Sequence, residues 1–149
     1  MKKTKTETNE ERTAIEILLA EDSPEAVILM KVLMRQSRFP IHWNVARDGA
    51  EALAMLRDPR NFSDKRIPDL ILLDLGMPKM NGCEVLEEIK KDGNLKNIPV
   101  LIMTNSTDDR DISSAYEHNA NFYMVKPQDI EHSTEMVKYL EDFWLQNIR

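Results

Sequence analysis

Three acidic residues stand directly after two apolar runs. Glu21 and Asp22 follow residues 15–20, and Asp74 follows residues 70–73. If both runs are parallel strands, their carboxyl ends meet at the sheet edge where open α/β folds bind ligands. Three close carboxylates repel one another unless a cation lies among them. Because no His or Cys stands beside these acids, the oxygen-only set predicts a Mg2+ site.

Two further polar residues follow the next two stretches that are mostly apolar. Thr104 follows residues 99–103, and Lys126 follows residues 121–125. At the same sheet edge they supply a hydroxyl donor and a fixed positive charge, which would balance a dianionic group on Asp74. This layout suits attack by an aspartate carboxylate on phosphorus, with a metal ion and a lysine stabilising the equatorial oxygens.

The elements that must position these groups alternate along the chain. We expect strands at residues 15–20, 41–46, 70–74, 99–103 and 121–125, and helices at residues 24–34, 48–57, 82–91, 108–119 and 129–148. This alternation predicts an α/β fold in which helices cover both faces of a parallel sheet. Right-handed crossovers favour the flavodoxin-like, doubly wound (βα)5 sheet with strand order 2-1-3-4-5. Its switch point lies between strands one and three, which lead to the three acids.

Apolar residues recur along each helix at a spacing of three to four, which predicts the face that packs on the sheet. The expected inward residues are Val27, Met30, Val32, Leu33 and Met34; Ala50, Leu53, Ala54 and Leu56; Val85, Leu86 and Ile89; and Ile130, Met136, Val137, Leu140, Phe143 and Trp144. Near the end of the chain Phe143, Trp144 and Ile148 either pack on the sheet edge or form a homodimer contact with the last strand. The polar stretch 58–66 is expected to be a long solvated loop.

The composition is that of one folded domain. The chain has 149 residues, 42% hydrophobic and 31% charged, which is long enough to bury a core. A net charge of −6 argues against a nucleic-acid partner, because phosphate backbones require a basic surface. The single cysteine, Cys83, cannot form an internal disulfide, and no run approaches the roughly 18 apolar residues of a membrane span. We therefore expect a cytoplasmic protein with no membrane partner.

The two ends of the chain are expected to add no second domain. Residues 1–13 have no apolar side chain after Met1, so they cannot offset the entropy cost of ordering, and we expect a disordered tail. Residues 14–149 would then form a single domain. Only one helix is expected after Lys126, which leaves no room for an output domain.

The polar residues together resemble the receiver domain of two-component response regulators. The similarity covers about residues 15–148. It consists of Glu21-Asp22, Leu-Asp-Leu-Gly-Met-Pro around Asp74, Asn81-Gly82, Met103-Thr104, and Tyr123 with Lys126-Pro127. The resemblance implies that Asp74 is the phosphoacceptor and that a sensor histidine kinase donates the phosphoryl group from a phosphohistidine.

The same resemblance assigns roles to the surrounding residues. The three acids and the main-chain carbonyl of Gly76 would hold Mg2+. Thr104 and Lys126 would bind the oxygens of the phosphoryl group on Asp74. Tyr123 would be an aromatic switch that turns inward when Thr104 moves toward the phosphate.

A finer similarity is to the small single-domain regulators that serve bacterial phytochromes. It rests on the long stretch 58–66, the Glu-Val-Leu-Glu-Glu-Ile-Lys run at residues 84–90, Asn105-Ser106, and Ala-Asn-Phe-Tyr at residues 120–123. It implies a phytochrome histidine kinase as the partner and an output through contact with a downstream protein of unknown identity. Because the family often dimerises through its fourth helix, last strand and last helix, a homodimer is a further expected contact.

Three other functions are open to the same fold. A pseudo-receiver would dock partners without phosphorylation, but the intact acids, Thr104 and Lys126 speak against it. A flavodoxin-like electron carrier needs a phosphate-binding loop after strand one, where Glu21 and Asp22 would repel the phosphate of FMN. An aspartyl-phosphate hydrolase would have a second aspartate two residues after its nucleophile, where this chain has Gly76. We therefore expect no enzyme activity beyond the chain's own phosphoryl transfer and autodephosphorylation.

Overall fold

Five parallel strands form the central sheet. The computed structural model describes residues 14–62, 67–77, 80–104, 122–127 and 130–147. The strands are β1 (Ile15–Ala20), β2 (Ile41–Ala46), β3 (Leu70–Asp74), β4 (Val100–Thr104) and β5 (Phe122–Val125). They lie in the order β2-β1-β3-β4-β5, which confirms the predicted sheet. Because β1 pairs with β3, with Ala20 opposite Leu73, the residues at the carboxyl ends of these two strands leave the sheet side by side.

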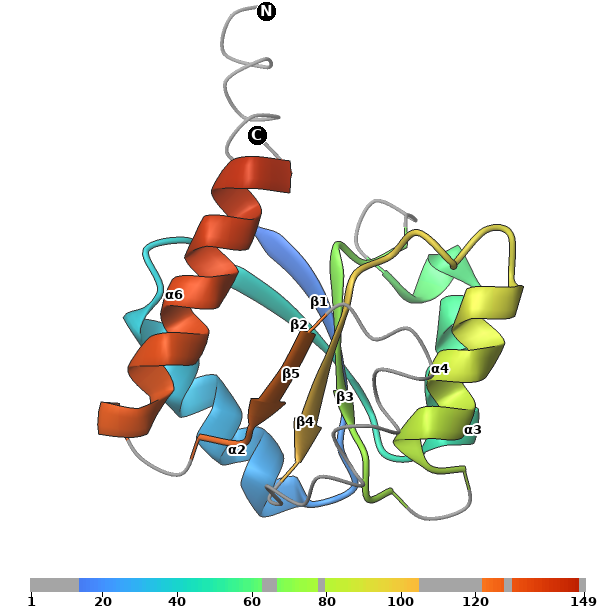
Figure 1. Ribbon diagram of the computed structural model, residues 1–149, viewed down its shortest axis with the longest axis horizontal. Coiled ribbons are helices and arrows are strands. Elements are labelled where there is room, and N and C mark those ends of the chain that lie inside the picture. The colour runs from blue at the N-terminus through green and yellow to red at the C-terminus, as the bar shows by residue number, and fades with distance from the viewer. Residues whose placement is uncertain (1–13, 63–66, 78–79, 105–121, 128–129, 148–149) are drawn as a thin grey trace, which may run out of the picture.

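Helices cover both faces of this sheet (Figure 1). The helices of one face are α2 (Pro24–Leu33), continued by the 3-10 helix η1 (Met34–Gln36), and α6 (Ile130–Asn147). Those of the other face are α3 (Gly49–Leu56), followed by the 3-10 helix η2 (Pro59–Asn61), and α4 (Gly82–Lys91). The predicted helix at 108–119 and the predicted tail at 1–13 lie outside the described residues. None of the described helices combines the length and the hydrophobicity that a membrane-spanning segment requires.

Capping side chains determine where three of these helices begin. Ser23 precedes α2, Asp48 precedes α3 and Asn81 precedes α4, and the side chain of each accepts a hydrogen bond from an amide in the first turn. At α4 the side chain of Glu84 also accepts the Asn81 amide, which completes a capping box. These caps set the first residue of each helix on the segment that follows a parallel strand.

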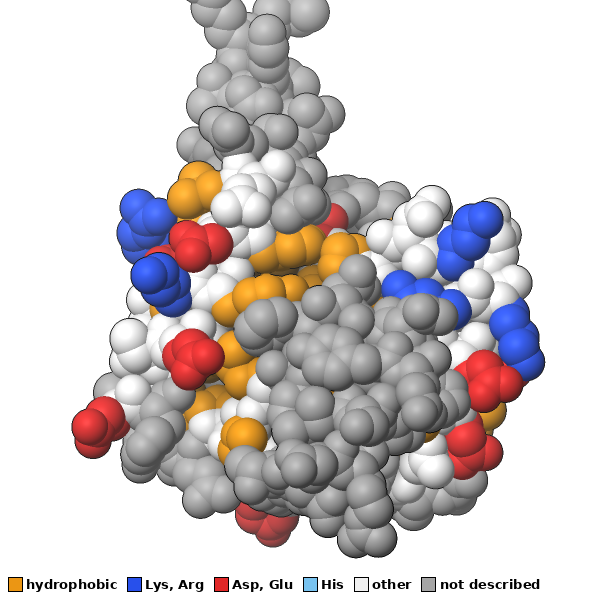
Figure 2. Space-filling model, in the orientation of Figure 1, with side chains coloured by type: hydrophobic (Ala, Val, Ile, Leu, Met, Phe, Trp, Pro, Cys, Tyr) orange, Lys and Arg blue, Asp and Glu red, His pale blue; other side chains and the backbone are white. Residues whose placement is uncertain are grey.

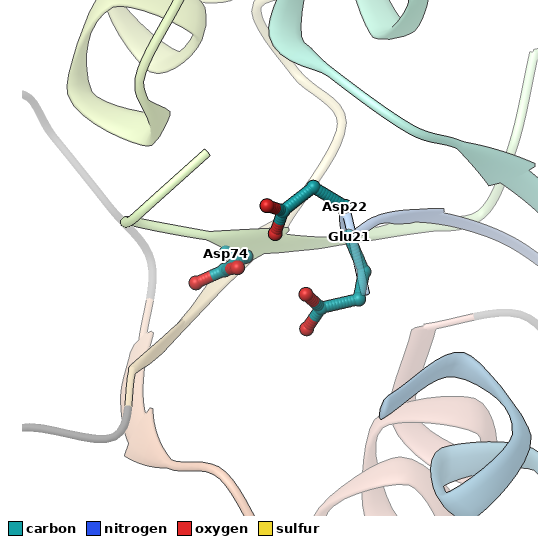
Figure 3. A group of neighbouring side chains, drawn as sticks. All are labelled: Glu21, Asp22 and Asp74. Atoms are coloured by element: carbon teal, nitrogen blue, oxygen red, sulfur yellow. The ribbon is translucent and has the colours of Figure 1, made fainter. Parts of the chain in front are cut away.

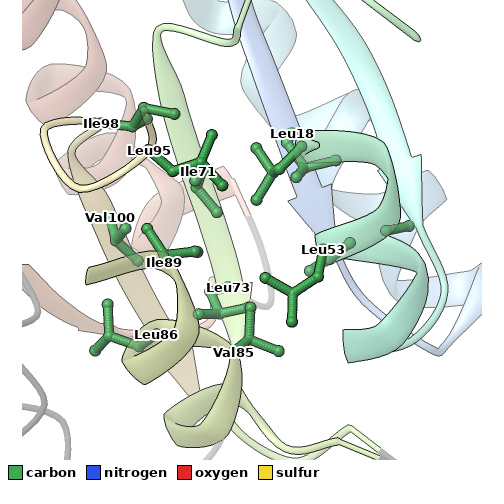
Figure 4. Close-up of a cluster of buried hydrophobic side chains, with 14 of the residues drawn as sticks. Leu18, Leu53, Ile71, Leu73, Val85, Leu86, Ile89, Leu95, Ile98 and Val100 are labelled. Carbon is green, nitrogen blue, oxygen red and sulfur yellow. The ribbon is translucent and has the colours of Figure 1, made fainter. Parts of the chain in front are cut away.

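The core has two layers, one on each face of the sheet. The layer beneath α3 and α4 contains Leu18, Leu53, Ile71, Leu73, Val85, Leu86, Ile89 and Val100 (Figure 4). The layer beneath α2 and α6 contains Ile17, Leu19, Met30, Leu33, Leu72, Met136, Leu140 and Trp144. Strands β1, β3 and β4 contribute alternate residues to both layers, which explains their nearly unbroken apolar runs.

Three residues that we predicted to face inward are exposed instead. Val32 on α2 is 43% exposed, and Ala50 and Ala54 on α3 are also exposed. Residues three or four apart share one side of a helix, whereas residues two apart do not. Val32 is two residues after the buried Met30, and Ala54 is two residues before the buried Leu56. The predicted buried face of each of these two helices was therefore too wide.

The stretch after α3 contains an anchored turn rather than only a solvated loop. The side chain of Asp58 accepts the Arg60 amide at 3.1 Å and caps η2. Phe62, directly after η2, is buried in the layer beneath α3 and α4. The expectation of a solvated loop was wrong for this part because a single aromatic side chain holds it to the core. Residues 63–66 lie outside the described residues.

The aromatic side chains of α6 pack within the chain. Trp144 is 5% exposed, and its ring centroid lies 6.3 Å from that of Phe39. Phe143 stacks with Tyr139 at a centroid distance of 6.5 Å. Of our two alternatives, packing against the fold accounts for Phe143 and Trp144, whereas Ile148 lies outside the described residues. These two rings therefore need no second copy of the chain to cover them.

Candidate functional site

The three predicted acids converge at the carboxyl ends of β1 and β3. Glu21 and Asp22 follow β1, and Asp74 is the last residue of β3. One carboxylate oxygen from each lies within 4.8 Å of the others (Figure 3). Glu21 and Asp74 are buried, whereas Asp22 is exposed. The cluster therefore joins two desolvated carboxylates to one that reaches solvent.

Lys126 places its ammonium group between the two buried acids. Its Nζ lies 2.5 Å from Glu21 Oε1 and 3.2 Å from Asp74 Oδ2. The lysine is held at this edge because its amide donates to the carbonyl of Thr104 at 2.8 Å, which continues the pairing of β4 with β5. Thr104 itself ends β4 and is buried. The sheet thus brings together five of the residues that we predicted for the site.

Two backbone amides orient the buried acids, and the sequence analysis did not predict them. The amide of Ser23 donates to Glu21 Oε2 at 3.2 Å, and the amide of Gly76 donates to Asp74 Oδ1 at 3.1 Å. Each donor stands two residues after its acid, at the turn that follows a strand. Such local bonds are common for acids at turns, so the position of each acid just before a turn was the available signal.

Burial and charge shift the pKa values of Glu21 and Lys126. Burial raises the pKa of Glu21 above the ordinary 4.5, and the charge of Asp74 raises it further, despite the hydrogen bond from Lys126. Burial lowers the pKa of Lys126, but its bond to Glu21 and the charges of both acids outweigh this, so the pKa lies above the ordinary 10.5. Lys126 therefore remains a cation at neutral pH, and its single charge faces the two buried carboxylates of Glu21 and Asp74.

The donor atoms of this cluster fit a hard divalent cation. All three acids offer carboxylate oxygens, and no His or Cys belongs to the group. Oxygen ligands of this kind suit Mg2+ and Mn2+, whereas Zn2+ and copper favour nitrogen or sulfur. A divalent ion would also relieve the repulsion that raises the pKa of Glu21. The acids present are therefore suited to a hard divalent cation, and the choice of Mg2+ stays a prediction.

The structure describes no contact for two groups with predicted roles, the side chain of Tyr123 and the carbonyl of Gly76. The backbone of Tyr123 lies in β5 opposite Ile102, but its side chain lies outside the described part of the chain. Gly76 is exposed beside Asp74, and its described contact is made by its amide rather than by its carbonyl. The aromatic switch and the carbonyl ligand therefore stay predictions.

Comparison with known proteins agrees with this geometry. The chain is 37% identical over 132 residues to response regulator Rcp1 of Synechocystis sp., a match that covers 89% of this chain and 90% of Rcp1. It is 37% identical over 131 residues to a probable methanogenesis regulatory protein, FilR2, of Methanothrix harundinacea, covering 87% of this chain and 83% of FilR2.

Solved structures give the same relationship. The phosphorylated cyanobacterial phytochrome response regulator RcpA matches with a TM-score of 0.77 and 38% identity, over 91% of this chain and 97% of that one. The Mn2+-bound form of Rcp1 matches with a TM-score of 0.74 and 36% identity, over the same shares. The family model of the response regulator receiver domain matches residues 17–138. The chain therefore belongs to the response regulator receiver domain family.

Proposed function

We propose that this chain is a single-domain response regulator that accepts a phosphoryl group on Asp74 in a Mg2+-dependent reaction. The observation that carries the proposal is the contact of Asp74 with Lys126 at 3.2 Å, inside a group of three acids whose oxygens lie within 4.8 Å of one another. An acid that serves only structure has no need of two further acids beside it. A carboxylate that must receive a dianionic group requires both the lysine and a metal ion.

The transfer itself needs little more than positioning by the chain. An oxygen of Asp74 attacks the phosphorus of a phosphohistidine on a sensor histidine kinase, and the new O–P bond forms as the N–P bond breaks. The imidazole nitrogen leaves with the electron pair of that bond. Gly76 holds one carboxylate oxygen through its amide, which leaves the other beside the ammonium group of Lys126. Lys126 and the hydroxyl of Thr104 would then bind the transferred oxygens.

The metal ion has a separate and supporting part. Glu21, Asp22 and Asp74, with the carbonyl of Gly76, would hold Mg2+, which neutralises the charge that develops on the phosphoryl oxygens. The Mn2+-bound form of Rcp1, a relative of this chain, supports a divalent ion in such a site. Removal of Mg2+ by a chelator should therefore prevent phosphorylation.

The proposed partners follow from the relatives of this chain and from its predicted switch residues. A phytochrome histidine kinase is the proposed donor, because RcpA is a phytochrome response regulator. We further propose that residues 14–149 act as one receiver domain in the cytoplasm. The signal would pass through contact with a downstream protein, with Tyr123 and Thr104 as the switch. A pseudo-receiver that docks without phosphorylation is the alternative that the test below must exclude.

We also propose a homodimer through β5 and α6, with contact residues other than Trp144. Trp144 is too buried to form the contact, but Val125 on β5 is 40% exposed and Leu145 on α6 is 38% exposed. Figure 2 shows hydrophobic side chains gathered beside α6, with charged side chains on both flanks of this face. Substitution Leu145→Glu should weaken self-association in sedimentation experiments; an unchanged profile would remove this contact from the proposal.

The deciding experiment is phosphorylation of the purified chain followed by intact mass measurement. The chain is incubated with Mg2+ and acetyl phosphate, and the variants Asp74→Asn and Asp69→Asn are treated in the same way. Asp69 is the matched control, because it precedes the opposite end of β3 and its carboxylate accepts the Glu16 amide, which an asparagine oxygen could also do. The wild type and Asp69→Asn should gain one phosphoryl mass, and Asp74→Asn should gain none.

Two outcomes would contradict the proposal. Phosphorylation of Asp74→Asn would move the acceptor elsewhere. No gain of mass in the wild type, either with acetyl phosphate or with a phosphorylated phytochrome kinase, would favour the pseudo-receiver.

A further inference from the structure

Two glycines that we did not predict as site residues contact the loop that follows Asp74. Gly49 is the first residue of α3, and Gly82 is the first residue of α4. Neither has the positive φ angle that excludes other residues. The need for glycine at these positions therefore comes from the space around them and not from the backbone conformation.

Gly82 lies against the backbone of the phosphoacceptor itself. A Cβ atom at this position would be 2.7 Å from the Asp74 carbonyl oxygen and 2.9 Å from Leu75 Cα. The amide of Gly82 also donates to the Leu75 carbonyl at 3.2 Å. Moving the Asp74 carbonyl from 2.7 Å to 3.4 Å, where ordinary contact begins, requires a shift of about 0.7 Å. Because the crowded atoms belong to the backbone, no side-chain rotation can supply that shift.

Gly49 lies against the other end of the same loop. A Cβ atom here would be 2.6 Å from Val85 Cγ2 and 2.8 Å from Met80 Cβ, and still closer to the Met80 carbonyl oxygen. Met80 directly precedes Asn81, the cap of α4. The first turn of α3 therefore presses on the point where the loop enters α4.

The atoms held between these two contacts belong to the candidate site. The amide of Leu75 donates to the Met103 carbonyl at 3.1 Å, which ties the start of the loop to β4. The next amide, that of Gly76, donates to Asp74 Oδ1 at 3.1 Å. A shift of the loop would therefore alter both the carboxylate and the amide that orients it.

We propose that Gly49 and Gly82 are positioning residues for Mg2+ binding and phosphoryl transfer, because the lack of a side chain lets α3 and α4 close on the described parts of the loop between β3 and α4. This inference rests on the proposed function of Asp74. Reactive groups must be held within about 0.5 Å of their productive positions. A misplacement of roughly 1 Å by a change away from the chemistry can lower a rate by about 100-fold.

The test compares two crowded glycines with an uncrowded one. The variants are Gly82→Ala, Gly49→Ala and the matched control Gly93→Ala, since a Cβ at Gly93 would have no atom within 4 Å. A second control, Ile17→Val, loses stability in the opposite core layer without contact with the loop. Three quantities are measured: the Gly76 amide chemical shift in the metal-free protein, Mg2+ affinity by calorimetry, and the rate of phosphorylation by acetyl phosphate.

We expect Gly82→Ala to shift the Gly76 amide resonance, to slow phosphorylation, and to weaken Mg2+ binding by about tenfold or more, the loss typical of changes behind the metal ligands. Gly49→Ala should do the same to a smaller extent, because it acts on the far end of the loop. Gly93→Ala and Ile17→Val should change none of the three quantities. Thermal unfolding of all four variants shows whether the losses follow stability instead.

The inference is overturned if Gly82→Ala and Gly49→Ala keep the wild-type Gly76 resonance and Mg2+ affinity, or if Ile17→Val loses affinity to the same degree. Failure of the proposed function gives a different result. The wild type would then take up no phosphoryl group, while the Gly76 resonance in the metal-free variants would still report whether the two glycines position the loop.

Discussion

Strands β1 and β3 carry acidic side chains at both of their ends, in two different environments. At the carboxyl ends, Glu21 and Asp74 are buried near a third acid, Asp22, and share the charge of Lys126. At the amino ends, Glu16 is equally buried, but its carboxylate accepts a hydrogen bond from the amide of a neutral side chain on β2. Burial of a carboxylate is thus common to both ends, and its partners distinguish them.

The amino-end cluster is organised around satisfied hydrogen bonds. Asn44 Nδ2 donates to Glu16 Oε2 at 2.7 Å and to the Ile17 carbonyl at 3.1 Å. His42 Nδ1 lies 3.0 Å from the same carboxylate oxygen. The carboxylate of Asp69 accepts the Glu16 amide at 2.9 Å, so the two acids meet through backbone and not through their charges. This arrangement stabilises the start of three strands and offers no place that requires a cation.

Repulsion among acids, rather than burial, distinguishes the end of the sheet that we propose to bind a cation. A buried acid with neutral donors has its hydrogen bonds satisfied by the fold alone. A buried acid beside two others is destabilised until an external cation arrives. The difference can be tested by removing one group at a time from each end.

The largest expected effect is on Mg2+ affinity. Glu21→Gln and Asp22→Asn each remove a proposed Mg2+ ligand from the carboxyl-end cluster, and we expect each to weaken Mg2+ binding by at least about tenfold, since even changes behind the ligands of a metal cost that much. Glu16→Gln is the matched control, because it removes an equally buried carboxylate at the opposite end of β1. Calorimetric titration measures all three.

Equal loss of Mg2+ affinity in Glu16→Gln would show that the acids at either end of β1 can determine Mg2+ binding. Wild-type affinity in both Glu21→Gln and Asp22→Asn would contradict the assignment of the metal ligands.

The next effect is on stability at the amino end. Asn44→Leu leaves the Glu16 carboxylate without its 2.7 Å donor, so we expect the free energy of unfolding to fall by about 1–3 kcal/mol. Mg2+ affinity should stay at the wild-type value. Urea unfolding measures the first quantity and calorimetry the second.

The double variant Glu16→Met with Asn44→Leu provides the control for this prediction. Replacing both members of a buried polar pair with apolar side chains is often close to neutral, so part of the lost stability should return. A double variant less stable than Asn44→Leu alone would show that the carboxylate itself, and not the loss of its Asn44 donor, matters to the fold.

The carboxyl-end cluster could be predicted from sequence, whereas the amino-end cluster could not. Each acid of the first stands where an apolar run stops, and parallel strands collect such positions at one edge. In the second, Glu16 looks like an interruption within an apolar run. Its partners Asn44 and His42 lie on another strand, at a spacing that indicates nothing until the register of β1 and β2 is known. The local sequence pattern therefore predicts which residues stand at the ends of strands. The partners of a polar residue inside a strand depend on how the strands pair.

The same limit explains the errors and omissions elsewhere. The order of the strands and most of their bounds could be predicted from the apolar runs. Val32 was wrongly predicted to face inward because the sequence does not show which side of α2 packs on the sheet. Phe62 was missed because one buried aromatic residue among polar neighbours leaves no period to detect. Gly49 and Gly82 were missed as positioning residues because the need for space is created by atoms distant in sequence.

A smaller effect appears in the pH dependence of stability. Burial, and then the charge of Asp74, place the pKa of Glu21 above the ordinary 4.5 in the folded, metal-free protein. The folded state therefore holds this proton more tightly than the unfolded state. Stability should fall as the pH rises from about 4.5 through the raised pKa of Glu21.

Urea unfolding in the presence of a chelator, from below pH 4.5 upward, measures this slope. Glu21→Gln should remove its contribution. Asp58 affects stability in the opposite direction. Its hydrogen bond with Arg60 lowers its pKa below the ordinary 3.8, so its contribution to the free energy of unfolding is lost as the pH falls. A pH profile unchanged by Glu21→Gln would show that the acid cluster carries no strain in the metal-free protein.

The smallest expected effect belongs to the exposed member of the amino-end cluster. The His42 side chain is 55% exposed, and its contact with Glu16 is therefore screened by solvent on one side. We expect His42→Gln to lower the free energy of unfolding by no more than about 1 kcal/mol, the usual limit for exposed pairs. Mg2+ affinity should not change. If His42→Gln instead destabilises the chain as much as Asn44→Leu, the exposed imidazole holds Glu16 in place as strongly as the buried amide does, and exposure would not rank the two partners.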